Sequence, residues 1–317
     1  MRQRSPLLTV HFSLFTLFMK AWSSARFTID LPPGHRFPIA KYAMIRDGVV
    51  ASGALARGDI HEPDRADRWA LELVHTRPYV DAIMDGGISA AEARRLGFPW
   101  SDQLRERSLR TVQGTLEAAR DALADGAGVN LAGGTHHAFP GHGEGFCVLN
   151  DVAVAVRVLQ REGRIRRAAI LDLDVHQGNG TAAIFAGDPD VFTFSMHGAK
   201  NFPFHKERSS LDLELPDGTD DPSYLLPLTS HLHAVLEDSR PDIVFYLAGA
   251  DPYAGDRFGR LALSFDGLRR RDTQVLGACQ SHGVPIVLTM AGGYARVLED
   301  VVTIHSNTVA ELRRAYG

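Results

Sequence analysis

Residues 168–180 read AAILDLDVHQGNG, and this stretch decides the fold that the sequence predicts. The run before Asp172 is apolar, which predicts a buried strand over Ala168–Val175. Asp172, Asp174 and His176 then take every second position, so a strand that continued through them would place all three on one face. Two carboxylates and an imidazole are costly to bury together without a partner. The pattern therefore predicts a divalent metal at the end of this strand.

The rest of the chain alternates between strand and helix patterns. Apolar runs predict four more strands, at Val129–Ala132, Val191–Ser195, Ile243–Ala248 and Pro285–Met290. Helices are predicted after a capping box at Ser89 and Glu92, over Ser101–Ala124, from an N-cap at Asn150 to Gln160, from an N-cap at Asp266 to Ser281, and over 296–316. The 317 residues, 44% of them hydrophobic, can form a substantial core. The alternation predicts an α/β fold, a single domain with three layers, α/β/α, around a central, mostly parallel sheet.

Four of the predicted strands end in polar groups flanked by glycine. These ends are Gly133-Gly134-Thr135-His136-His137, the run with Asp174 and His176, Gly249-Ala250-Asp251 and Gly292-Gly293-Tyr294. Ligands of such sheets bind outside the carboxyl ends of the strands. We therefore expect all four ends to build one site.

Asp174, His176 and Asp251 are the expected metal ligands. Two oxygens and one nitrogen leave a coordination position open, which is typical of catalytic zinc. Such a metal polarises a carbonyl and lowers the pKa of its water towards 7. The alternative, in which these groups only cap turns, leaves the nearby histidine pair without a purpose.

His136 and His137 are adjacent, and we expect them to move protons. Asp172 and Asn179 are the expected partners of the two rings. A carboxylate favours imidazolium more than an amide does, so the histidine paired with Asn179 should be the better neutral base. The phenol of Tyr294 could donate to a developing oxyanion, and its alternative role is a packed aromatic ring.

Together these motifs resemble the histone deacetylase superfamily, zinc-dependent deacylases with the arginase/deacetylase fold. The resemblance runs from about Leu31 to the final helix, and also includes Gly145-Phe146-Cys147 and Gly255-Asp256-Arg257. It implies a hydrolase that removes acetyl or longer acyl groups from lysine side chains, with zinc on Asp174, His176 and Asp251 and with iron(II) left open. It implies that His137 is the general base, that His136 and His137 protonate the leaving amine, and that Tyr294 stabilises the tetrahedral intermediate.

The resemblance also implies roles outside the metal centre. Gly145, Phe146, Phe202 and Gly293 would line the substrate channel, with ordinary packing as the alternative for Phe202. Asp172 and Ser195 would hold a structural potassium ion. At the positions of Gln177 and Asn179, the chain resembles the class IV branch and its bacterial relatives. Class IV enzymes favour long acyl chains over acetyl, so the resemblance extends the expected substrates to longer acyl groups.

The sequence offers three alternatives to protein deacylation. Deacetylation of acetylated polyamines or other small acyl-amines keeps the chemistry and changes the substrate. An arginase-like enzyme with two manganese ions would need carboxylates in place of Gln177 and Asn179. A binding protein without activity would be expected to have lost one of the catalytic groups, and all are present.

Composition limits partners and location. The net charge is −4 and no basic block occurs, so a nucleic-acid surface is not expected. The two cysteines, Cys147 and Cys279, are far apart in the sequence and favour a reducing, cytoplasmic compartment.

Residues 1–20 read as an N-terminal extension or a weak signal-like segment, which is too short to span a membrane. Residues 21–317 are expected to form the catalytic domain. The oligomeric state is left open.

Overall fold

A computed structural model describes residues 19–317, and its centre is a sheet in which every strand pair is parallel. The strand order is β2-β1-β3-β8-β7-β4-β5-β6. The strands are β1 (Ala21–Trp22), β2 (Ile60–His61), β3 (Ala127–Asn130), β4 (Ala168–Asp172), β5 (Val191–Gly198), β6 (Leu211–Leu215), β7 (Ile243–Leu247) and β8 (Ile286–Thr289). The expected parallel sheet is therefore confirmed.

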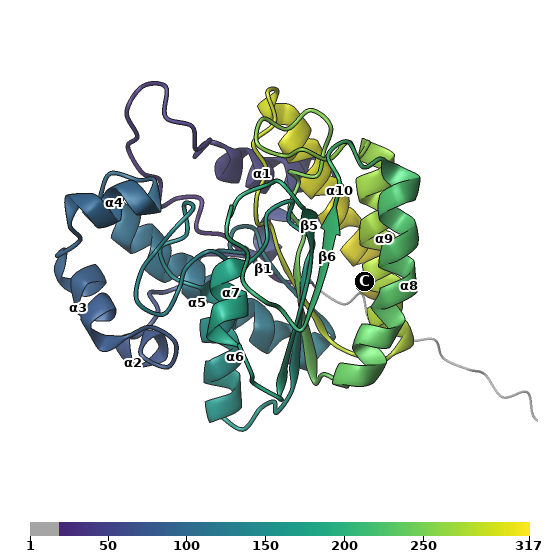
Figure 1. Cartoon of the computed structure of the whole chain (residues 1–317), viewed down its shortest axis with the longest axis horizontal. Coiled ribbons are helices and arrows are strands. Elements are labelled where there is room, and N and C mark those ends of the chain that lie inside the picture. The colour runs from purple at the N-terminus through teal and green to yellow at the C-terminus, as the bar shows by residue number, and fades with distance from the viewer. Residues whose placement is uncertain (1–18) are drawn as a thin grey trace, which may run out of the picture.

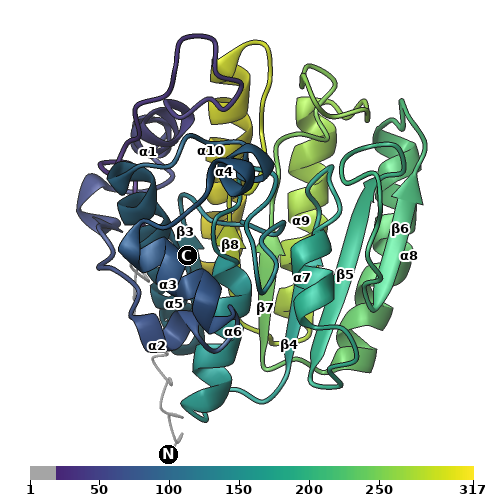
Figure 2. The same cartoon turned by 60° about the vertical axis from the view of Figure 1, so that its left-hand side comes forward.

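Helices cover both faces of this sheet (Figures 1 and 2). One layer consists of α1 (Lys41–Ala51), α8 (Asp221–Ser239), α9 (Phe265–Ser281) and α10 (Leu298–Tyr316). The other contains α5 (Asp102–Asp125), α6 (Asp151–Arg161) and α7 (Asn179–Ile184), with α2 (Arg68–Leu71), α3 (Arg77–Asp85) and α4 (Ala90–Leu96) beyond them. The predicted three-layer α/β/α architecture is confirmed.

Two hydrophobic cores fill the spaces between the layers. Strand β7 contributes to both cores, because its side chains alternate between the two faces of the sheet. Val244 and Tyr246 belong to the core under α8–α10, whereas Ile243, Phe245 and Leu247 belong to the core under α5 and α6. A strand buried on both faces needs a continuous apolar run, and β7 is such a run.

Strand β4 ends at Asp172, three residues earlier than the alternating pattern predicts. Beyond it, Leu173 N–H still donates to Leu247 O of β7 at 3.1 Å, but the next three amides donate to carboxylates. Asp174 N–H donates to Asp172 Oδ1 (3.2 Å), Val175 N–H to Asp251 Oδ1 (2.9 Å) and His176 N–H to Asp174 Oδ1 (2.9 Å). The prediction of a strand to Val175 was wrong because carboxylates of the site accept from the amides of residues 174–176, which would otherwise continue the strand ladder.

Other boundaries differ for local reasons. The N-cap of α9 is Ser264, whose Oγ accepts from Gly267 N–H at 3.0 Å, and not Asp266, which lies in the first turn. Met19 is buried in the core, so the fold begins before residue 21. The rest of the predicted extension, residues 1–18, lies outside the described residues. No helix of the described part is long and apolar enough to cross a membrane.

Candidate active site

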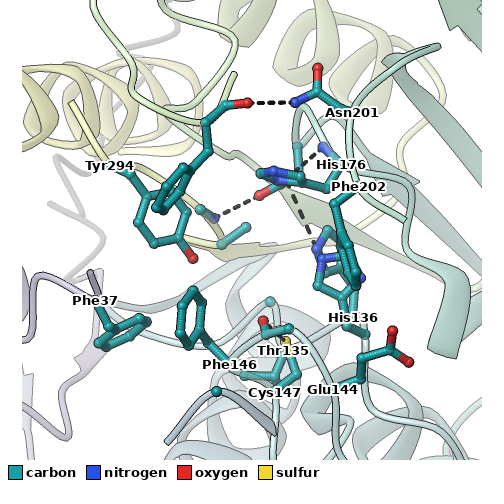
Figure 3. Close-up of a pocket in the computed structure, with 18 of the residues that line it drawn as sticks. Phe37, Thr135, His136, Glu144, Phe146, Cys147, His176, Asn201, Phe202 and Tyr294 are labelled. Carbon is teal, nitrogen blue, oxygen red and sulfur yellow. Dashed lines mark hydrogen bonds and ion pairs between the residues drawn. The ribbon is translucent and has the colours of Figure 1, made fainter. Parts of the chain in front are cut away.

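A pocket of about 720 Å³ opens at the carboxyl ends of the central strands. Its lining includes residues that follow β3, β4 and β8, among them His136, His137, His176 and Tyr294. Figure 3 shows His136 and His176 on one side of this pocket and Tyr294 on the other. The parallel register of the strands thus brings together groups that are far apart in sequence.

Asp174, His176 and Asp251 form the group that could hold a metal ion. One ligand atom from each lies within 4.8 Å of the others. His176 Nδ1 lies 2.9 Å from Asp174 Oδ1 and 3.3 Å from Asp251 Oδ2. These are the three ligands that the sequence predicts.

The surroundings of the two carboxylates fit a divalent cation. Both are buried, and burial together with the charge of Asp174 raises the pKa of Asp251 to about 6. Among the described residues, Asp251 Oδ2 has no hydrogen-bond partner. A Cβ at Gly292 would lie 1.8 Å from that oxygen and 2.6 Å from Asp174 Oδ2, so the glycine keeps this space open. A cation between the carboxylates would relieve their repulsion and occupy the free oxygen.

Arg271 braces the segments that carry these ligands. Its side chain is fully buried in α9, and Nη1 donates to the carbonyl oxygens of Gly249 (2.7 Å) and Leu173 (3.4 Å). Its charge is balanced by Asp272, 2.8 Å from Nη2. One guanidinium therefore joins the residue before Asp174 to the segment that leads to Asp251.

The adjacent histidines have different partners. His136 Nδ1 lies 2.7 Å from Asp172 Oδ2, and His137 Nδ1 lies 2.7 Å from Asn179 Oδ1. Burial alone would lower the pKa of His136, but Asp172 and Asp174 outweigh it and raise that pKa to about 9. Burial and the charges of the neighbouring imidazoles lower the pKa of His137 well below its usual value. The two rings are thus biased towards opposite protonation states.

Tyr294 is held by a buried acid, Asp256, for which the sequence predicts no role. Asp256 Oδ2 accepts from Tyr294 N–H at 2.6 Å, while Oδ1 accepts from the amides of Phe258 (2.8 Å) and Gly259 (2.9 Å). The Tyr294 ring lies 5.0 Å from that of Phe258, and burial raises the pKa of its phenol well above the usual value. The hydroxyl therefore stays protonated as it points into the pocket (Figure 3).

Aromatic rings form the walls of the pocket. Figure 3 places Phe146 with Phe37 on one side and Phe202 on the opposite side. The Phe202 ring lies 4.9 Å from that of His137. Gly145 fits between these groups, because a Cβ there would lie 2.6 Å from His137 Cδ2 and 3.1 Å from Phe202 Cε1.

Gly293 does not line the pocket, in contrast to its expected role in substrate binding. It faces away, since a Cβ there would lie 2.9 Å from Val301 Cγ1 of α10. Its carbonyl accepts from the buried Lys41 Nζ at 3.4 Å. The neighbours Gly292 and Tyr294 line the pocket instead.

The two residues expected to hold potassium face each other in the sheet. Asp172 and Ser195 are register partners between β4 and β5. The Ser195 hydroxyl lies 2.9 Å from His197 Nδ1, and Asp172 Oδ2 is engaged by His136. Both side chains therefore already have partners.

Gln177 anchors the loop that carries Phe202. Its Nε2 donates to Glu207 O (2.6 Å) and Asp212 Oδ1 (2.9 Å), and its Oε1 accepts from Glu207 N–H (2.8 Å). The residue after His176 thus fixes one wall of the pocket.

Two positioning acids were missed by sequence reasoning. Asp151 accepts from the amides of Gly134 (3.0 Å) and Thr135 (2.8 Å), and so shapes the loop before the histidine pair. It directly follows the predicted N-cap Asn150, which was the only signal. Asp256 lies in the motif Gly255-Asp256-Arg257, which belongs to the family resemblance. The motif alone does not indicate that Asp256 accepts a hydrogen bond from Tyr294 N–H.

Comparisons with known proteins agree with this geometry. Residues 35–309 match the family model described as the histone deacetylase domain. An uncharacterized protein of Picosynechococcus sp. is 47% identical over 280 residues, which cover 88% of this chain and 93% of that protein. Histone deacetylase 2 of Arabidopsis thaliana is 31% identical over 281 residues, or 84% of this chain and 73% of the relative.

A solved structure shares the fold. The crystal structure of an HDAC homolog from Aquifex aeolicus superposes with a TM-score of 0.79 at 23% identity, and covers 93% of this chain and 84% of that one. The family match spans most of the chain, and the site lies within it. The chain therefore belongs to the histone deacetylase family and is a hydrolase of the deacetylase kind.

Proposed function

We propose that this protein removes acyl groups from lysine side chains, with zinc held by Asp174, His176 and Asp251. One observation carries the proposal: two histidines of opposite protonation bias and a protonated phenol line the same pocket as Asp174 and His176, which Asp251 joins in a possible metal site. Such a metal supplies a polarised amide carbonyl and a water of lowered pKa.

The histidines divide the proton transfers between them. His137 is the general base, because its low pKa keeps the ring neutral while Asn179 Oδ1 holds Nδ1–H and leaves Nε2 free. His136 is held as imidazolium by Asp172 and supplies positive charge beside it. The pair can thus accept one proton at His137 and return one to the leaving amine.

Tyr294 and the aromatic walls act on the substrate itself. The phenol donates to the oxygen of the carbonyl as negative charge develops there. Phe146 and Phe202, on opposite sides of the pocket, hold the apolar stem of the lysine between them. This arrangement keeps water away from the stem and directs the amide towards the histidines.

Finer assignments extend this proposal. Gln177 and Asn179 support a place near the class IV branch, which would extend the substrates from acetyl-lysine to lysines with longer acyl chains. Potassium on Asp172 and Ser195 would lie behind the site and stabilise it. Iron(II) is the other metal that the same ligands could hold.

The proposal is tested by the purified, zinc-loaded protein on a panel of lysine peptides carrying acyl groups from acetyl to myristoyl, and on acetylated polyamines. The matched control is Asp251→Asn, which removes a ligand charge without changing shape. We expect the protein to hydrolyse at least one acyl-lysine peptide and the variant to hydrolyse none. Cleavage of small acyl-amines alone would overturn the assignment to lysine side chains.

A further inference from the structure

The mouth of the pocket is basic although the chain as a whole is acidic. Five exposed basic side chains belong to its lining: Arg36, Arg95, Lys200, Arg257 and Arg260. Among the described residues, the lining contains only two acids, Glu144 and the proposed metal ligand Asp174. We call these five residues the basic rim. The chain has a net charge of −4, so positive charge is concentrated at this opening.

Much of this charge is not neutralised by the protein. Lys200 and Arg260 share Asp217, at 3.9 Å and 3.2 Å. Within residues 19–317, no carboxylate oxygen lies within 4.0 Å of the guanidinium nitrogens of Arg36, Arg95 or Arg257. The acid at the mouth, Glu144, is 3.6 Å from His142.

The rim is attached directly to the walls of the pocket. Arg257 Nε donates to Tyr294 O (2.9 Å), and Nη2 donates to Arg36 O (3.1 Å). Arg95 precedes Leu96, whose carbonyl accepts from Phe146 N–H at 2.8 Å. Positive charge therefore flanks the entrance both beside Tyr294 and beside Phe146.

We propose that the basic rim selects acyl-amine substrates that carry negative charge outside the acylated amine, and that it disfavours cationic ones such as acetylated polyamines. Resting on the proposed function, this makes an acyl-lysine with neighbouring Asp or Glu residues the preferred substrate. The unpaired guanidinium groups attract such carboxylates, and they repel the free ammonium groups of a polyamine. Because the rim is exposed, this preference weakens as salt is added.

The test compares three peptides with the same acyl-lysine core and two flanking residues on each side, which are Asp, Ser or Lys. With the zinc-loaded protein, we expect kcat/KM to fall in that order, by about five- to thirtyfold from the acidic to the basic peptide at low salt. The ratio should shrink in about 0.5 M salt. Arg95→Glu should lower the ratio, whereas the control Arg94→Glu, exposed on the same helix but outside the pocket lining, should leave it unchanged.

Equal kcat/KM for the three peptides would refute selection by the basic rim. The same acidic-to-basic ratio of kcat/KM in Arg95→Glu and Arg94→Glu would refute it too. Neither result would contradict lysine deacylation. If no peptide is cleaved, the proposed function fails instead. A second pair then tests the rim alone: N-acetylputrescine and the matching N-acetyl amino acid, in which a carboxylate replaces the ammonium. Faster cleavage of the anionic compound supports the rim, and faster cleavage of the cationic compound, or cleavage of neither, overturns it.

Discussion

Replacing Gly292 with Ala tests whether the carboxylates of Asp174 and Asp251 hold the metal. The new Cβ would lie 1.8 Å from Asp251 Oδ2 and 2.6 Å from Asp174 Oδ2, whereas real Cβ contacts essentially never fall below 3.0 Å. The Asp251 carboxylate must therefore move by more than about 1 Å, and metal sites tolerate only about 0.2 Å. We expect the affinity for zinc to fall by at least about a hundredfold, which is the upper end of the loss when a supporting residue is removed.

The assay is competition with a chromogenic chelator for zinc, together with thermal unfolding in the presence and absence of zinc. Overpacking costs about 1–3 kcal/mol, so the variant should still unfold cooperatively. The control is Gly277→Ala in α9, where a Cβ meets nothing within 4 Å. It should bind zinc normally and gain about 0.5–1 kcal/mol of stability. A Gly292→Ala protein with wild-type zinc affinity would refute the assigned ligands.

Further predictions concern the phenol, acid stability and the buried arginine. Tyr294→Phe keeps the ring packing but removes the donor, so turnover should fall about a hundredfold or more at unchanged zinc affinity; unchanged turnover contradicts the role. Burial lowers the pKa of His75 to about 4 in the folded state. The unfolded chain therefore takes up this proton first, and as the pH falls from 6.5 to 4 the free energy of unfolding should fall by up to about 3 kcal/mol through this group. His75→Gln should flatten that pH dependence in urea titrations, and parallel curves would argue against it. Arg271→Met should destabilise the fold by about 3–5 kcal/mol, because it leaves Asp272 buried without its cation, and a loss as small as that of the exposed Arg269→Met would disprove the bracing role.

The sheet and the grouping of Asp174, His176 and Asp251 could be predicted from the sequence because each rests on a local pattern. Buried parallel strands need continuous apolar runs, as in β7, and their carboxyl ends meet at one edge. Asp174, His176 and Asp251 follow such runs directly. The order and direction of the predicted strands were therefore enough to predict that these three side chains lie close together.

What could not be predicted depends on contacts between distant segments. β4 ends at Asp172, and beyond it the amide of Val175 donates to the carboxylate of Asp251, which lies 76 residues after Val175 in the sequence. The direction of Gly293 is set by α10 and by Lys41, more than 250 residues away in sequence. Strands as short as β1 and β2, with two residues each, are too short for periodicity to reveal.

Removal of the metal shows whether hydrolysis depends on it. The protein is stripped with a chelator, dialysed, and assayed on the best acyl-lysine peptide before and after stoichiometric zinc or iron(II) is added. We expect the stripped protein to stay folded, to lose hydrolysis, and to recover it with about one metal ion per chain. Hydrolysis that persists in verified metal-free protein would mean that Asp174, His176 and Asp251 do not act through a bound metal.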